Sequence, residues 1–342
     1  MTDAKSPAIE RPESDRSGRG VGLNAPLVSV IVVSFNTRES TVVCLETILQ
    51  DCRDIPHEVW LVDNASSDGS VAAIRDRFPT IRMIENPQNL GFGAANNRAL
   101  QHASGEFVFL LNSDAFVRPG TVNALIDFLR RHPDTAAVGP RLLNEDGSLQ
   151  QSCYRFPSPA RAISESFLLS AAFPDHPVLG DGRNWPHDRE AFVDFVIGAA
   201  CLVRRQALEK VGGFDEAFFL YAEETDLCFR LHQAGWKTGF TPNAEVVHLS
   251  KGSGRTQSAK VFSEFHHAKE LYFRKHYGFG GLVLYRFALF SGALLRVMLF
   301  AMLLRAGKTS PRNVARFAEW KRILRWVSGQ RGERLQPMNQ GN

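Results

Sequence analysis

The 342-residue chain is 44% hydrophobic and 22% charged, a balance that excludes a wholly disordered protein and leaves room for one large domain or two. Its five cysteines are odd in number and scattered, which excludes a disulfide framework and indicates a reducing, cytosolic environment. The net charge of +4 is spread unevenly, because residues 305–334 hold nine Lys or Arg against two Glu. A basic segment next to an apolar one indicates anionic lipid, with nucleic acid as the rival partner.

The first half of the chain alternates predicted strands with predicted helices. Residues 1–25 are rich in Ser, Asp, Arg, Gly and Pro, and we expect a disordered leader there. The alternation that follows predicts a mostly parallel, Rossmann-like α/β sheet flanked by helices, with ligands at the carboxyl ends of its strands. We expect strands at 27–34, 58–62, 81–85, 106–111 and 136–139, and helices at 38–51, 68–78, 94–103 and 119–132.

The second half is less regular and ends in an apolar stretch. Phe192–Val203 predicts a buried strand or strand pair. Gly281–Leu304 is long and apolar enough to cross a bilayer, but Arg286 and Arg296 interrupt it. We therefore expect a helix that lies in the membrane interface or a hairpin that dips into it, followed by a basic amphipathic helix at 314–327. The alternative is a helix packed on the rest of the protein.

An acidic cluster occupies residues 223–226. Glu223, Glu224 and Asp226 follow the apolar run Phe219–Ala222 and open a helix predicted at 225–234. Carboxylates this close repel one another, and such a cluster can set one of them to take a proton while others bind metal or orient a hydroxyl. The alternative is a solvated helix start, because Asp and Glu favour the first turn.

Polar residues follow the first two predicted strands. Ser34 and Asn36 end the first strand, where a polar turn can contact a nucleotide base. Asp63 and Asn64 end the second strand, where a carboxylate can accept hydrogen bonds from an imide N–H or from ribose hydroxyls. Helix capping accounts for the later residues of this loop but leaves Asp63 and Asn64 unexplained.

A glycine-containing segment opens the helix predicted at 94–103. Gly91 and Gly93 permit close backbone approach, and a helix N-terminus favours phosphate. The pattern that runs to Asn97 lacks the third glycine of a dinucleotide fingerprint and follows the third strand rather than the first. A nicotinamide-dependent enzyme is therefore disfavoured.

The turn Asn112-Ser113-Asp114 follows the apolar fourth strand. A carboxylate there, with an amide two residues before it, can hold a divalent cation that bridges two phosphates. An ordinary Asx-turn is the alternative. His248 ends a short predicted strand and, with Asp114 available, is a candidate metal ligand.

These motifs occur in an order that resembles a known family. The segments are VSVIVVSFN, VDNASSDGS, NLGFGAANN, FVFLLNSDA, GGFDEAFFLYAEETDLCFRLHQAGW and VVH. They are similar to the family 2 inverting glycosyltransferases of the GT-A fold, and most similar to the bacterial rhamnosyltransferase-like branch that builds cell-wall and O-antigen linkers. The resemblance covers about residues 27–250.

The resemblance implies a role for each motif. Asp114 would occupy the metal-binding acid of the Asp-x-Asp motif for Mg²⁺ or Mn²⁺, although Asn112 replaces its first acid. Glu224 would be the general base, and Asp226 would anchor the acceptor loop or the helix start. Glu223 is a further catalytic candidate, and His248 can join the metal. The residues expected to bind the nucleotide sugar are Ser34, Asn36, Asp63, Asn64, Gly91, Gly93, Asn97, Asn112 and Ser113.

The expected function is transfer of a sugar from a dTDP- or UDP-linked donor to a lipid-linked or polysaccharide acceptor in cell-envelope glycan synthesis. The expected sugar is L-rhamnose, with dTDP-rhamnose as its donor. The enzyme would be peripheral on the inner face of the cell membrane. Alternatives are another donor sugar (a hexose or galactofuranose), a soluble or protein acceptor, and a non-catalytic module that binds sugar nucleotides. Nucleic acid is disfavoured because it would leave the acidic cluster and the Asp63 loop unused.

The resemblance also suggests how the chain is divided. We expect a GT-A domain at 26–275, apolar and basic helices at 281–330, and a disordered tail at 331–342. The sequence leaves open whether the chain forms a homo-oligomer.

Overall fold

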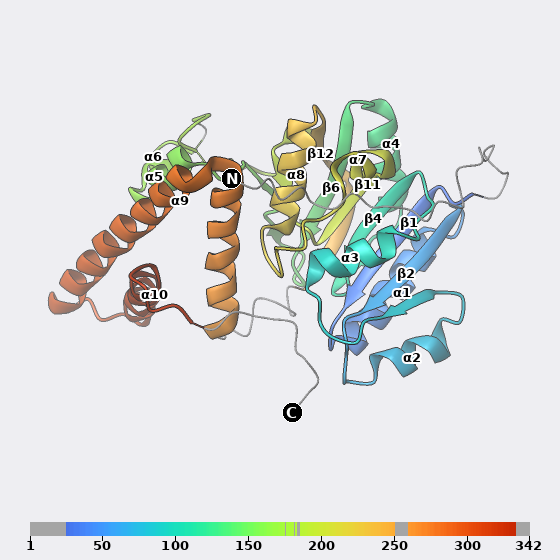
Figure 1. Cartoon of the computed structure of the whole chain (residues 1–342), viewed down its shortest axis with the longest axis horizontal. Helices are drawn as coiled ribbons and strands as arrows, with labels where there is room; N and C mark the ends of the chain where they lie inside the picture. The colour runs from blue at the N-terminus through green and yellow to red at the C-terminus, as the bar shows by residue number, and fades with distance from the viewer. Residues whose placement is uncertain (1–24, 175, 181, 183–184, 250–258, 333–342) are drawn as a thin grey trace. The chain divides into compact units, whose positions relative to one another are not determined.

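The computed structural model describes residues 25–174, 176–180, 182, 185–249 and 259–332. It divides into two compact units (Figure 1). The sheet unit comprises the described residues up to Tyr154 and from Trp185 to Leu249, and the helical unit comprises those from Arg155 to Gly182 and from Ala259 to Gly332. The predicted leader and tail lie almost wholly outside the described residues.

Four parallel strands form the first half of the large sheet. β1 (Val28–Ser34) pairs with β2 (His57–Asp63) on one side and with β4 (Phe107–Asn112) on the other, and β3 (Arg82–Glu85) extends beyond β2. These strands form because their β-branched and aromatic residues are covered on both faces, which suits a parallel sheet. Their shared direction brings their carboxyl ends to one edge.

The second half of the sheet is mixed. β11 (Ala200–Arg204) runs antiparallel between β4 and β6 (Thr135–Leu143), and β12 (Lys237–His248) pairs in parallel with β6. The expected parallel arrangement is therefore confirmed for β3-β2-β1-β4, and the insertion of β11 makes the whole sheet mixed. The remaining strands are β5 (Ala115–Val117), β7 (Leu149–Gln150), β8 (Cys153–Tyr154), β9 (Ala191–Val193) and β10 (Phe195–Val196).

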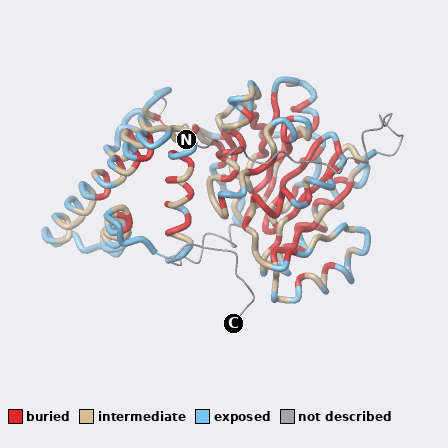
Figure 2. The backbone as a smooth tube through the Cα atoms, in the orientation of Figure 1, coloured by how far each residue is buried: buried red, intermediate tan, exposed pale blue. Residues whose placement is uncertain are grey.

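Helices cover both faces of this sheet, and the buried residues concentrate in the strands between them (Figure 2). One face packs against α1 (Arg38–Asp51), α2 (Ser70–Arg77) and α4 (Thr121–Arg131). The other packs against α3 (Phe92–Leu100), α7 (Arg205–Val211) and α8 (Glu223–Gln233). The strands and helices predicted in the first 139 residues are confirmed, with ends displaced by a few residues.

The helical unit contains the predicted apolar segment. Its elements are α5 (Pro159–Ser166), α6 (Leu169–Ala172), α9 (Ala259–Arg305) and α10 (Pro311–Val327). Gly278 breaks α9 with non-helical angles of φ 66° and ψ −167°. Among the described residues, α9 is the one helix that is long and apolar enough to cross a membrane by length and composition. In its most apolar 18-residue stretch, 17% of the residues are buried.

Candidate active site

Ser34 and Asp63 meet at the carboxyl ends of β1 and β2. They are paired in the register of the two strands, and the Ser34 hydroxyl donates to Oδ1 of Asp63 at 3.3 Å. The other carboxylate oxygen of Asp63 accepts from the backbone N–H of Ser66 at 2.8 Å. Asp63 is only 2% exposed, so these bonds fix the orientation of its carboxylate at the sheet edge.

Asn64 lies beside Asp63 but faces the start of α3. Its side-chain amide donates to the carbonyl of Gly91 at 3.0 Å, and its oxygen accepts from Asn86 at 2.8 Å. The side chain is 3% exposed. These contacts join the loops that follow β2 and β3, and they account for an amide at this position.

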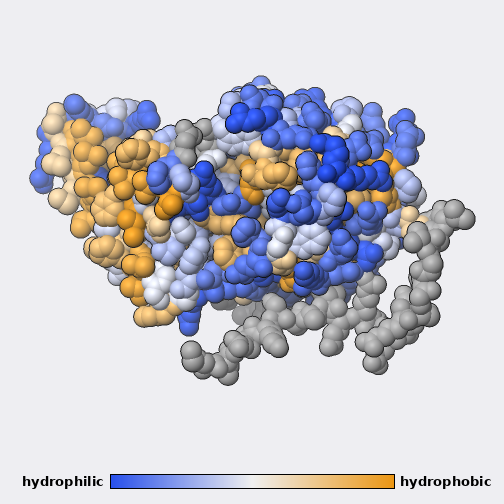
Figure 3. Space-filling view, turned by 90° about the horizontal axis from the view of Figure 1, so that it is seen from above, coloured by the Kyte–Doolittle hydropathy of each residue, from blue (hydrophilic) through white to orange (hydrophobic). Residues whose placement is uncertain are grey.

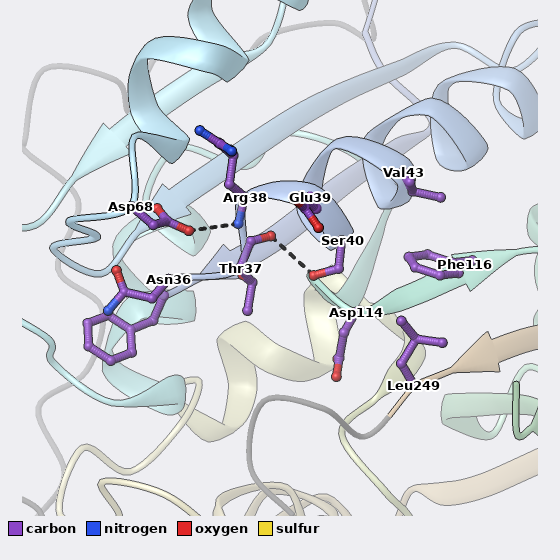
Figure 4. Close-up of a pocket in the computed structure, with 11 residues that line it drawn as sticks. Asn36, Thr37, Arg38, Glu39, Ser40, Val43, Asp68, Asp114, Phe116 and Leu249 are labelled. Carbon is purple, nitrogen blue, oxygen red and sulfur yellow. Dashed lines mark hydrogen bonds between the residues drawn. The ribbon is translucent and has the colours of Figure 1, made fainter. Parts of the chain in front are cut away.

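Asn36 and Asp114 line the same cavity, which has a volume of about 720 Å³ (Figure 4). Asn36 has a positive φ of 53°, and its side-chain oxygen accepts from the backbone N–H of Ser67 at 2.8 Å. Thr37, also on the cavity wall, is hydrogen-bonded to Ser113 through the two hydroxyls at 2.9 Å. The cavity therefore connects the turn after β1 with the turn after β4.

Asp114 and His248 come together because the end of β12 pairs with the start of β5. The Oδ1 atom of Asp114 lies 3.3 Å from Nε2 of His248, and Nδ2 of Asn112 lies 3.5 Å from the same nitrogen. Both Asp114 and His248 are less than a tenth exposed. The structure thus confirms that the sequence motifs meet, although they are more than 130 residues apart.

Gln150 sets the orientation of the His248 ring. Its Oε1 atom is 2.7 Å from Nδ1 of His248, and its Nε2 atom donates to Asn144 at 3.0 Å. Because an amide oxygen accepts hydrogen bonds only, Nδ1 carries the proton in the neutral ring and Nε2 presents its lone pair towards Asp114. A carboxylate oxygen and an imidazole nitrogen facing each other suit a divalent cation.

This pair fits a metal site that is completed by a ligand. Within the described residues, no three His, Cys, Asp or Glu side chains gather where they could hold a metal ion. Asp114 and His248 would therefore supply two ligands, and further oxygen atoms would come from a bound diphosphate. Asn112 adds no second charge to this pair, and it is its Nδ2 atom that faces Nε2 of His248.

Glu224 stands at the start of α8, behind a sharp turn in which Tyr221 and Ala222 both have positive φ. Its side chain is partly buried, and burial raises the pKa of its carboxyl group above the ordinary value of 4.5. The backbone N–H groups of Glu224 itself, of Thr225 and of Gly198 oppose that rise by favouring the charged carboxylate. The next residue, Ala199, accepts from the N–H of Asn112 at 2.9 Å, which links Glu224 to the turn that carries Asp114.

Asp226 is fully buried and pairs with an arginine. Its Oδ2 atom lies 2.8 Å from Nε of Arg230, one helical turn along α8. The same guanidinium donates to the carbonyls of Val211 and Gly213, both at 2.7 Å. Asp226 therefore joins α8, through Arg230, to the glycine turn that follows α7, and its predicted anchoring role stays a prediction.

The glycine motif at the start of α3 is joined to the segment that leads into α8. Gly91 has a φ of +84°, and a Cβ atom there would lie 2.1 Å from the carbonyl oxygen of Phe219. The N–H of Phe92 donates to that carbonyl at 3.0 Å, and the N–H of Gly91 donates to Asn89 at 2.9 Å. These two N–H groups have protein acceptors, so we do not assign the diphosphate to them.

Gly93 and Asn97 contact the same segment one turn later. The Asn97 side chain accepts from the N–H of Phe214 and donates to its carbonyl, both at 2.9 Å. A Cβ on Gly93 would lie 3.1 Å from Cβ of Phe214. Both residues therefore hold the loop before α8, and their predicted contact with the donor stays a prediction.

Two residues of the site were missed in the sequence. Gln150 lies in a two-residue strand with no periodic pattern, so nothing local indicated its contact with His248. Gly198 had a signal, because a glycine inside an apolar run often marks a close approach of the backbone. Nothing in the sequence indicated which group approaches it.

We predict that Asp226→Asn destabilises the protein because it leaves a buried guanidinium without its counter-ion. The expected loss in the free energy of unfolding is about 3–5 kcal/mol, measured by urea denaturation. Glu209→Gln, which breaks the exposed ion pair with Arg205, is the matched control and should cost less than about 1 kcal/mol. A variant as stable as the wild type but inactive would instead give Asp226 a role in the reaction.

Comparison with known protein families agrees with this geometry. Residues 29–212 match the family model for glycosyl transferase family 2, and residues 187–330 match that for glycosyl transferase family group 2. The first match contains the turns of Ser34, Asp63 and Asp114, and the second contains Glu224 and His248. Together they span both halves of the site.

Similar proteins and structures fall in the same group. The chain is 35% identical over 225 residues to the N-acetylglucosaminyl-diphospho-decaprenol L-rhamnosyltransferase of Mycobacterium tuberculosis, covering 62% of this chain and 72% of that protein. It is 26% identical over 183 residues to the rhamnosyltransferase WbbL of Escherichia coli, covering 50% and 66%.

A solved structure shows the same fold. The mannosyltransferase of Pyrobaculum calidifontis, in complex with GDP-Man and Mn²⁺, superimposes with a TM-score of 0.56 at 20% identity, covering 88% of this chain and 85% of that one. An identity this low shows the fold alone. The chain therefore belongs to glycosyl transferase family 2, as a nucleotide-sugar-dependent glycosyltransferase of the GT-A fold in the rhamnosyltransferase-like branch.

Proposed function

We propose that this enzyme transfers L-rhamnose from dTDP-rhamnose to a lipid-linked acceptor, with inversion at the anomeric carbon, in bacterial cell-envelope glycan synthesis. One observation carries the chemistry: the turn that brings Asp114 to His248 is hydrogen-bonded to Ala199, and the residue before it, Gly198, lies against the partly buried Glu224. The sugar and the acceptor class are supported by the printed name of the Mycobacterium tuberculosis relative.

The nucleoside of the donor would bind along the turn after β1. Asp63 is buried with its carboxylate held by Ser34 and Ser66, so it can accept further bonds from a base or ribose without reorganising. Asn36 is exposed on the wall of the 720 Å³ cavity, where a base could contact it. A pyrimidine at this end places the diphosphate towards Asp114.

Glu224 would act as the general base. In its ionised form its carboxylate accepts a proton from the acceptor hydroxyl, and the oxygen attacks the anomeric carbon from the face opposite the nucleotide. The raised pKa makes the carboxylate a stronger base than an exposed glutamate. The backbone N–H groups at the start of α8, with that of Gly198, would favour the ionised carboxylate.

Asp114 and His248 would hold a Mg²⁺ or Mn²⁺ ion on the donor diphosphate. When bound, the cation neutralises the charge that develops on the departing nucleotide. Gln150 keeps the His248 ring turned towards Asp114, and Ser113 is fixed by Thr37. The cation in the Pyrobaculum calidifontis structure makes metal use plausible for this fold.

A lipid-linked acceptor places the enzyme at the cytoplasmic face of the cell membrane. The relative's printed name describes a diphospho-decaprenol substrate, and an isoprenoid chain of that length stays in the bilayer. The apolar helix α9 supports a peripheral location.

The donor proposal is tested by a hydrolysis screen of purified nucleotide sugars. We expect dTDP-rhamnose to be cleaved fastest, with UDP-linked hexoses and UDP-galactofuranose slower. Release of dTDP is measured with and without a polyprenyl-diphosphate sugar acceptor, which should stimulate it. Preference for a hexose or galactofuranose donor would overturn the choice of sugar, and failure to cleave any donor would favour a binding module.

We predict that Glu224→Gln lowers turnover by at least ~100-fold while donor affinity is retained. A base works only when ionised, so the wild-type rate should fall as pH drops through a pKa above 4.5, and this acid limb should vanish in the variant. A carboxyl group with a raised pKa in the folded state makes the protein less stable as the pH rises through that pKa. Glu224→Gln removes this charge, so the variant should be at least as stable as the wild type at neutral pH. Near-normal turnover would move the base to Glu223 or Asp226.

We predict that Asp114→Asn removes most of the gain in dTDP affinity that Mn²⁺ provides, by a factor of at least about ten. Isothermal titration of dTDP with Mn²⁺ or with EDTA measures it. Glu39→Gln is the matched control, because this exposed carboxylate lines the same cavity but comes from α1 rather than from the turn of Asp114 (Figure 4). Equal wild-type affinity in EDTA, with undiminished activity, would reject a metal at this site.

A further inference from the structure

The helical unit is organised around the break in α9 at Gly278. We call residues 259–277 the first arm and residues 279–305 the second arm. Two contacts hold the arms together: the rings of Phe273 and Tyr285 stack with centroids 4.4 Å apart, and Arg286 pairs with both carboxylate oxygens of Glu270 at 2.6 and 3.0 Å. The charge of Arg286 is therefore satisfied between the arms.

Arg296, the second charge within the apolar sequence, is also satisfied by protein groups. Its guanidinium donates to the carbonyl of Ser166 at 2.5 Å and to that of Glu165 at 2.8 Å, both at the end of α5. It also lies 4.6 Å from the ring centroid of Trp320 in α10. Tyr285 and Gly292 are buried at helical spacing and define the inner side of the second arm. Both arginines make their contacts with protein groups on this side.

The outer side of the second arm is a continuous apolar face. We define this apolar face by exposed side chains that recur at helical spacing, and they are 40–61% exposed. Figure 3 shows hydrophobic residues gathered over the C-terminal helices, at the left of the view. The residues that define the face are Leu284, Phe287, Phe290, Leu295, Met298 and Met302.

The α5–α6 segment adds apolar side chains that the sequence analysis did not single out. Leu168 is 50% exposed and Phe173 is 53% exposed, on either side of α6. The bonds from Arg296 to the carbonyls of Glu165 and Ser166 fix the end of α5, just before Leu168, on the second arm. Gly292 permits the contact, because a Cβ there would lie 2.8 Å from Cβ of Ser166.

Exposed cations occur at both ends of the second arm. Arg274 and Lys275 precede the break at Gly278, Arg305 ends the arm, and Lys308 and Arg312 follow it. Cations at both ends of an apolar helix match the anionic headgroups of a membrane surface, whereas a protein partner would have to supply acidic groups at both places.

We propose that the second arm lies along one leaflet of an anionic bilayer, with the apolar face and the side chains of Leu168 and Phe173 inserted and the terminal cations on the headgroups. The inference rests on the proposed membrane-linked acceptor and names the surface that would reach it. A spanning arm is disfavoured, because crossing would carry Arg296, the Glu270–Arg286 pair and the basic helix α10 into hydrocarbon.

Flotation of the full chain with vesicles of phosphatidylglycerol and phosphatidylcholine tests the surface. We expect binding that weakens with salt and is lower on vesicles of phosphatidylcholine alone. Phe287→Asp combined with Met298→Asp should lower the bound fraction at least tenfold. Ala72→Asp in α2 combined with Gln101→Glu just after α3 adds two negative charges at exposed positions of the sheet unit and should bind like the wild type.

A second pair of substitutions tests the α5–α6 segment. Leu168→Asp combined with Phe173→Asp should also weaken binding, and Asp tolerates the positive φ of 64° at position 168. Donor hydrolysis and circular dichroism establish that each variant is folded. Binding equal to wild type in this variant would remove the segment from the surface, and equal binding in both apolar variants would overturn the proposal.

The depth of insertion is tested by labelling. The five native cysteines are buried, so cysteines introduced as Phe279→Cys and Lys308→Cys report the two ends of the second arm. An impermeant maleimide added outside the vesicles should label both, whereas protection of one end would mean that the arm spans. The full-length protein could instead bind neither vesicle type and form a dimer that Phe287→Asp disrupts. That result would show that a second copy of the chain covers this face. Because flotation requires no donor or metal, that outcome would leave the transferase proposal standing.

Discussion

One backbone hydrogen bond, from the N–H of Asn112 to the carbonyl of Ala199, joins the two halves of the active site. It forms because β11 runs antiparallel beside β4, which brings the residues before β11 next to the turn after β4. The N–H of Gly198 then reaches Glu224 from one side of this junction, while Asp114 lies on the other. The proposed base and the proposed metal ligands therefore depend on the same strand pairing, although they come from distant parts of the sequence.

The polar residues at the site do two kinds of work. Asp63, Asp114 and His248 are held by protein contacts at strand ends, and we propose ligand-binding roles for them. Asn97 instead hydrogen-bonds to the backbone of Phe214, and Asp226 pairs with Arg230. These contacts fix the loop that precedes Glu224. A buried polar group needs such partners, because leaving it unsatisfied costs about 1–3 kcal/mol. This requirement explains why so many motif residues face the protein rather than the cavity.

The same logic operates in the helical unit. Arginines inside an apolar sequence would ordinarily disfavour contact with lipid. Here Glu270 and the carbonyl groups at the end of α5 take up those charges, and this leaves the outer side of the second arm apolar. The break at Gly278 makes the pairing of Arg286 with Glu270 possible, because a straight helix would place residues 16 positions apart about 24 Å from each other.

The sequence by itself determined the first half of the sheet, since β-branched runs that end in polar turns have few other solutions. It also placed Asp63, Asp114, Glu224 and His248 among the candidates, because carboxylates and imidazoles at strand ends or helix starts have recognisable chemistry. Only the tertiary structure decided which residues and strands contact one another. The antiparallel entry of β11, the contact of Gln150 with His248 and the burial of Asp226 against Arg230 depend on pairings between distant segments. No local pattern specifies such pairings, because the packing of the whole sheet sets which side chains meet.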